Sequence, residues 1–125
     1  MIPIPFDRDT IAAISTAQGR GGIAVVKISG PESLSVLHEV FSSRKDPARF
    51  PRSMIHGFVK DTSGATIDEA LAFHMPGPRS YTGENVAEIH VHGGTAAAEA
   101  CLALVLACGA RPAEPGERSE EHTSE

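Results

Sequence analysis

Short runs of alternating or β-branched apolar residues cover much of this 125-residue chain. Residues 10–15 and 22–30 have this character on either side of a glycine-rich turn (GRGG). Residues 54–60 and 66–75 have it on either side of a DTSG turn, and 86–92 alternates between apolar and polar positions. These runs predict five β-strands, because alternation places successive side chains on opposite faces of a sheet.

Two further segments have the periodicity of helices. The first, 31–43, begins at Pro31, a favourable first helical residue, and repeats apolar residues along one side. The second, 95–108, is followed by Gly109, which suits a helix C-terminus. Glu99 is the only charged residue of this segment, so the helix is apolar on nearly every side. Packing against one face of a sheet would bury only one of these sides. We therefore expect the helix to meet a second surface, such as another copy of the chain.

The predicted order is two strands, a helix, three strands and a helix. This order predicts an α+β domain, with a mixed sheet of about five strands covered on one face by two helices. Adjacent hairpins argue against a doubly wound nucleotide-binding fold. The run 86–92 divides into two faces, with Ala87, Ile89 and Val91 on one and Val86, Glu88, His90 and His92 on the other.

The composition is that of an ordinary folded domain, with 41% hydrophobic and 22% charged residues. Eleven Lys and Arg against sixteen Asp and Glu give a formal charge of −5. With three lysines and no basic cluster, the chain is expected not to bind nucleic acid by itself, so another domain or partner would hold any RNA. No segment has the length of a membrane span or the pattern of a secretion signal, which predicts a cytoplasmic protein with no membrane partner.

Several kinds of site lack the residues that they need. No Gly-Lys pair occurs, so the phosphate-binding loop of nucleoside triphosphatases is missing. Ser80 and Thr82 have no nucleophile context, and no catalytic residue is assigned. Cys101 and Cys108 have no third metal ligand near them in the sequence, so both are expected to be buried thiols.

Glu88, His90 and His92 leave three interpretations open. The two histidines could bind a metal, although a third ligand from the same strand would fit poorly. The face could instead be solvated, with hydrogen-bonded histidines. It could also hold a small polar ligand, since a carboxylate accepts two parallel hydrogen bonds from the amidine-like edge of a pterin or guanine. The turn at 19–22 and the loop at 80–84 are either plain turns or segments that approach such a ligand.

An ordered set of short motifs spans nearly the whole chain, and together they resemble the N-terminal domain of the tRNA-modifying GTPases called MnmE or TrmE. The motifs are 9–14 (DTIAAI), 19–23 (GRGGI), 28–31 (ISGP), 67–69 (IDE), 78–84 (PRSYTGE), 86–88 (VAE), 92–94 (HGG) and 115–117 (PGE). Each motif alone is weak evidence. Their order is specific, above all SYTGE followed by HGG.

The resemblance implies a domain that forms a homodimer and binds a tetrahydrofolate one-carbon derivative, 5-formyl- or methylene-tetrahydrofolate. Its fold would be related to that of the folate-binding aminomethyltransferases. In the family a helical domain and an inserted GTPase domain follow, and these would bind GTP, potassium and magnesium. The whole protein would act with a flavoprotein of the MnmG or GidA type on C5 of the wobble uridine in tRNA. This chain alone should have no GTPase activity.

The resemblance also implies the residues of the folate site. Glu88 would bind the pterin edge, and Lys27 would contact the polar part of the folate, where the family usually has arginine. The pocket would be shaped by Arg20, Gly21, Gly22, Tyr81, Thr82 and Gly83. A family lysine beyond the PGE motif has no counterpart here. The alternatives are a structural dimerisation module without a working ligand site, and a metal-binding domain that uses His90 and His92.

The sequence also predicts a boundary at residue 117. Residues 1–117 correspond to the family domain, whereas 118–125 (RSEEHTSE) matches the translation of a common sequencing adapter. We therefore expect the last eight residues to be a non-native tail.

Overall fold

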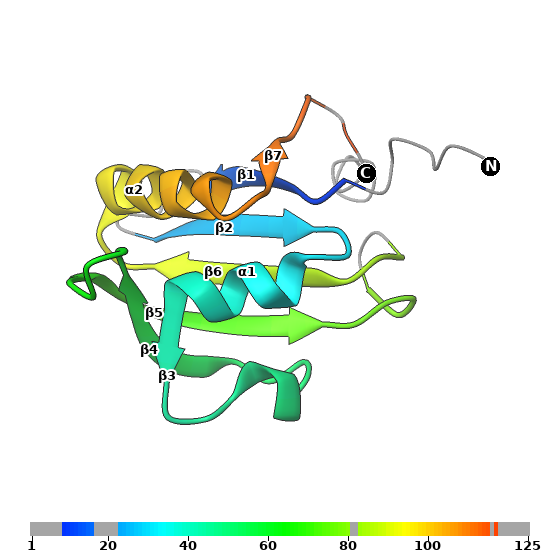
Figure 1. Cartoon of the computed structure of the whole chain (residues 1–125), viewed down its shortest axis with the longest axis horizontal. Coiled ribbons are helices and arrows are strands. Elements are labelled where there is room, and N and C mark those ends of the chain that lie inside the picture. The colour runs from blue at the N-terminus through cyan, green and yellow to red at the C-terminus, as the bar shows by residue number, and fades with distance from the viewer. Residues whose placement is uncertain (1–8, 17–22, 81–82, 116, 118–125) are drawn as a thin grey trace.

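One mixed β-sheet forms the centre of the protein (Figure 1). The computed structural model describes residues 9–16, 23–80, 83–115 and 117. The seven strands are β1 (Ile11–Thr16), β2 (Ala24–Ser29), β3 (Phe41–Ser43), β4 (Ile55–Lys60), β5 (Thr66–Met75), β6 (Val86–Val91) and β7 (Arg111–Pro112). Their order across the sheet is β3-β4-β5-β6-β2-β1-β7, and every neighbouring pair is antiparallel except β1 and β7. The helices are α1 (Ser33–Val40), the short 3₁₀ helix η2 (Pro47–Arg49) and α2 (Gly94–Ala107).

The α+β class and the five predicted strands are confirmed, but the count of about five is wrong for the described residues, which form seven strands. The missed strand β3 was predicted as the end of the first helix. Helix α1 instead ends at Val40, and Phe41 has an extended backbone paired with Val59 of β4. A Cβ on Gly57 would lie 2.6 Å from the Phe41 ring, so a glycine there lets this ring pack close to β4. Phe41 is buried in β3, and it also continues the apolar periodicity of the helix, so the apolar pattern could not separate the two conformations.

Both helices cover the same face of the sheet (Figure 1). Apolar side chains from α1 and α2 pack there against alternate residues of the central strands, in particular Ala87, Ile89 and Val91. This confirms the predicted division into two faces for residues 86–91, which form β6, and it identifies the core face. The opposite face of the sheet is therefore the one that carries Glu88 and His90.

Helix α2 buries Ala98, Cys101 and Val105 against the sheet and exposes small side chains such as Ala103 and Ala107 outward. Cys101 is buried as predicted, but the prediction that Cys108 is buried is wrong, because this residue caps the helix at its exposed end. Whether a second copy covers α2 stays a prediction. No helix in the described part of the chain has the length and hydropathy that crossing a membrane requires.

Candidate functional site

Lys27 and Glu88 lie directly opposite each other on the helix-free face, at the centre of the sheet. Strand β2 pairs with β6 so that these two residues are cross-strand partners, and Phe73 of β5 is the partner of Glu88 on its other side. Directly opposite residues in an antiparallel pair have Cβ atoms about 5 Å apart. The structure therefore brings together the two residues predicted to contact a folate.

Glu88 is a buried carboxylate, with only 5% of the residue exposed. Its Oε1 lies 2.9 Å from Nε2 of His90, which is two residues further along the same strand face. The ring of Phe73 is tilted against the His90 ring, with the centroids 6.2 Å apart. A carboxylate in such surroundings needs hydrogen-bond donors, and one imidazole N–H does not use all of its lone pairs.

The loop between β5 and β6 is fixed against the end of β2, beside this pair. Ser29 Oγ donates a hydrogen bond to Glu84 Oε1 at 3.2 Å, and Ser80 Oγ donates one to the backbone oxygen of Glu84. Asn85 accepts two more, from Gly77 N–H to its side-chain oxygen and from Gly30 N–H to its backbone oxygen, each 2.9 Å long. Ser29 of ISGP and Glu84 of SYTGE are therefore in contact, and Ser29 lies two residues after Lys27 in β2.

Sequence reasoning missed Glu84 and Phe73 as parts of this site. Glu84 belongs to the SYTGE motif, but only the fold shows that its carboxylate reaches Ser29. Phe73 comes to the site through the register of β5 against β6. Gly83 is exposed with a positive φ of 83°, which glycine adopts without strain. The other predicted pocket residues, Arg20, Gly21, Gly22, Tyr81 and Thr82, lie outside the described residues.

His92 does not join Glu88 and His90, although all three alternate along the chain. Its ring Nδ1 lies 3.2 Å from the backbone oxygen of Glu69, and its backbone N–H donates to Asp68. Within the part of the chain that the structure describes, no three His, Cys, Asp or Glu side chains gather as a metal site would require. The geometry therefore gives no support to the metal-binding alternative.

Arg111 joins the PGE motif to the start of β1. Its guanidinium donates to Asp9 Oδ2 at 2.8 Å and to Glu117 Oε2 at 2.7 Å. These hydrogen bonds raise the pKa of Arg111 above its usual value, so the residue stays charged. Glu117 and Asp9 are thus held by Arg111 at the sheet edge, three strands away from Glu88 in the order β6-β2-β1-β7.

Together, a mixed sheet covered by two helices on one face and a buried carboxylate opposite a lysine on the other define a small α+β domain with a polar candidate ligand site. The family described as GTP-binding protein TrmE N-terminus matches residues 10–122, and the chain belongs to this family. This confirms the resemblance that the motifs indicated.

Relatives with the name tRNA modification GTPase MnmE match the same region. The one from Roseiflexus sp. (strain RS-1) is 50% identical over 109 residues, which cover 87% of this chain and 24% of the relative. The one from Nitratidesulfovibrio vulgaris (strain DP4) is 49% identical over 113 residues, 87% of this chain and 24% of the relative. The one from Geobacter sulfurreducens is 48% identical over 113 residues, 90% of this chain and 25% of the relative. The chain thus spans about a quarter of the length of these relatives.

Proposed function

We propose that this domain binds a reduced folate, 5-formyl- or methylene-tetrahydrofolate, on the helix-free face of its sheet. The observation that carries the proposal is the buried carboxylate of Glu88 directly opposite Lys27. A carboxylate with little access to water forms strong paired hydrogen bonds with the amidine-like edge of a pterin. The ammonium of Lys27 complements the negative charge of a folate, and the Phe73 ring offers an apolar surface beside the pair.

The proposed role in the whole protein is to supply the one-carbon unit for C5 of the wobble uridine in tRNA. In this proposal the domain forms a homodimer, and the GTPase part and a flavoprotein of the MnmG or GidA type complete the reaction. GTP, potassium and magnesium would bind only in the GTPase part. The relatives' name supports tRNA modification as the process, and a kinship of the fold with the aminomethyltransferases is part of the same proposal.

A structural dimerisation module without a working ligand site is the second candidate. The hydrogen bond between His90 and Glu88 favours it, because it gives the buried carboxylate an internal partner. A lysine at position 27 also forms a weaker paired contact than the arginine expected in this family, because an ammonium lacks the planar fork of a guanidinium.

Calorimetric titration with 5-formyltetrahydrofolate tests the proposal. We expect Glu88→Gln to weaken binding at least tenfold, because the amide replaces one acceptor oxygen with a donor. Lys27→Arg should bind at least as tightly as the parent chain, and Glu99→Gln, on the exposed side of α2, is the matched control. Equal binding by Glu88→Gln and Glu99→Gln would overturn the site. A dimer in light scattering that takes up no folate would support the structural module instead.

A further inference from the structure

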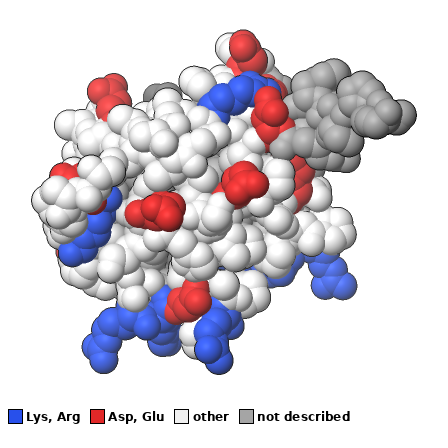
Figure 2. Space-filling view, in the orientation of Figure 1, with Lys and Arg blue, Asp and Glu red and all other residues white. Residues whose placement is uncertain are grey.

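A basic edge lies along the side of the sheet formed by β3, η2 and β4. It consists of Arg44, Lys45, Arg49 and Arg52, all of them exposed, within nine residues of sequence. Figure 2 shows blue side chains gathered along this lower edge, whereas red side chains are spread over the helix face. The prediction that the chain has no basic cluster is therefore wrong, because four of its eleven Lys and Arg residues lie here.

The single carboxylate within this segment is already engaged. Asp46 Oδ1 accepts a hydrogen bond from the N–H of Ala48 at 2.9 Å and lies 2.7 Å from His38 Nε2. These contacts lower the pKa of Asp46, with the backbone hydrogen bond as the largest cause. Arg52 donates to the backbone oxygens of Pro76 and Arg79, which brings the exposed Arg79 next to the basic edge. Asp46 therefore stays ionised, and with four cations against this one carboxylate, residues 44–52 carry a formal charge of +3.

Exposed apolar side chains are interleaved with these cations. Phe50 is 43% exposed, Met54 45% and Phe58 39%. The Lys45 Nζ lies 5.4 Å from the centroid of the Phe50 ring, which positions both side chains. Cations alternating with stacking surfaces are typical of proteins that bind single-stranded nucleic acid.

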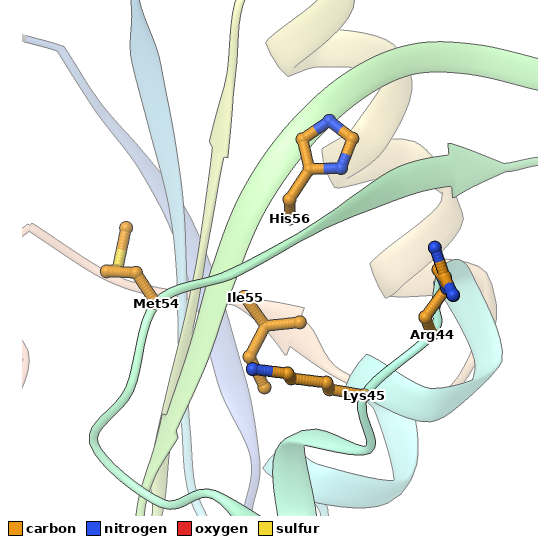
Figure 3. Close-up of a pocket in the computed structure, with 5 residues that line it drawn as sticks. All are labelled: Arg44, Lys45, Met54, Ile55 and His56. Atoms are coloured by element: carbon orange, nitrogen blue, oxygen red, sulfur yellow. The ribbon is translucent and has the colours of Figure 1, made fainter.

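A pocket of about 500 Å³ opens within this edge. Figure 3 shows Arg44 and Lys45 on the segment after β3, with Met54, Ile55 and His56 at the start of β4. The pocket residues lie on and before β4, two strands away from Glu88 on β6, and none of them belongs to the Glu88 site. The pocket places two cations beside an apolar wall, while the His56 imidazole at its side is paired with Glu69. Cations next to an apolar surface suit a phosphate that carries a base.

We propose that the basic edge binds RNA, with phosphates on Arg44, Lys45 and Arg49 and one unpaired nucleotide in the pocket. Charge complementarity selects the polyanion, and the stacking surfaces favour RNA over an acidic protein. This goes beyond folate binding and does not depend on it. The binding is expected to be weak, with a Kd on the order of 10⁻⁵ M at physiological salt, as for sequence-independent contacts.

Fluorescence anisotropy of the 125-residue chain with a labelled 12-nucleotide oligouridylate tests this proposal. Three phosphate contacts to a single strand predict roughly twentyfold weaker binding at 200 mM than at 50 mM salt. Arg44→Glu/Lys45→Glu should bind at least tenfold less tightly than the parent. The matched variant Arg44→Glu/Lys45→Glu/Glu39→Lys/Glu99→Lys keeps the net charge of −5, and its binding should be lost to the same degree.

Four results would count against the proposal. Binding by the charge-conserving variant at the level of the parent would show that net charge, and not this edge, matters. An affinity that is the same at both salt concentrations would exclude phosphate contacts. Displacement of the RNA by poly-glutamate at equal charge concentration would identify an acidic protein as the occupant. A 12-base-pair RNA duplex should bind less tightly than the single strand, and equal binding would remove the nucleotide from the pocket.

Discussion

The carboxylate of Asp68 accepts hydrogen bonds from the backbone N–H groups of His92 and Gly93, at 2.7 and 2.8 Å. It therefore satisfies two donors immediately before helix α2, where the helix dipole favours a negative charge. Gly93 allows a close approach, since a Cβ there would lie 2.8 Å from that of Ala97. The motifs IDE and HGG, far apart in the sequence, thus form one structural connection between β5 and α2.

Asp68→Ala should lower the free energy of unfolding by about 1–2 kcal/mol, because the two N–H groups lose their acceptor. Urea denaturation followed by circular dichroism measures this change. Glu69→Ala is the control, because its partner His56 is exposed and a surface pair contributes about 0–1 kcal/mol. Equal losses in the two variants would contradict the role of Asp68.

The ion pairs of Arg111 should make residues 115–117 necessary for full stability. A chain ending at residue 114 loses the Glu117 carboxylate and should unfold at a lower temperature than the full chain. A chain ending at residue 117 should unfold at the same temperature as the full chain, because 118–125 is predicted to be a non-native tail. Differential scanning calorimetry distinguishes the two truncations, and a large effect of the second would refute the predicted boundary.

The two cysteines should differ in reactivity. Burial raises the pKa of Cys101 to about 12, with Asp68 as a second cause, so this thiol carries almost no reactive thiolate at pH 8. Cys108 is exposed at the end of α2, although its pKa is also raised. A thiol-specific reagent should therefore modify one cysteine per native chain and two after unfolding. Cys108→Ser should abolish the native reaction, and continued modification would show that Cys101 is accessible.

His74 should make the fold sensitive to mild acid. It is buried, and its Nε2 has no hydrogen-bond partner in the described structure. Burial, helped by the positive charges of His38 and Arg52, lowers its pKa below the ordinary 6.5. As the pH falls below about 6.5, His74 is therefore protonated in the unfolded chain before it is protonated in the folded one. The free energy of unfolding thus decreases as the pH falls.

Urea midpoints of the parent and His74→Gln between pH 7.5 and 5 test this dependence. We expect the parent to lose stability over this range and the variant to lose less. His56→Gln, at an exposed position, should keep the slope of the parent. If all three chains have the same slope, another group is responsible.

The predicted elements agree with the fold wherever alternation or periodicity extends over several turns or residue pairs. Strand β7 has two residues and contains Pro112, so no pattern could indicate it. The predicted folate site stays a prediction, and the structure shows only which of its residues lie together. Lys27 and Glu88 were identified through the family motifs, whereas Phe73 and Glu84 join them only through strand register and loop folding. Local sequence does not determine which distant segments pair or in what register, so these two residues could not be predicted.

The described sheet ends in two strands that offer little to a further strand. On one side β3 has three residues, and on the other β7 contains Pro112, which has no backbone N–H to donate. Short and proline-containing edges prevent sheets of two molecules from joining into one. Two copies of this chain should therefore associate through a face, either the alanine-rich outer side of α2 or the surface that carries Glu88, and not by extending the sheet.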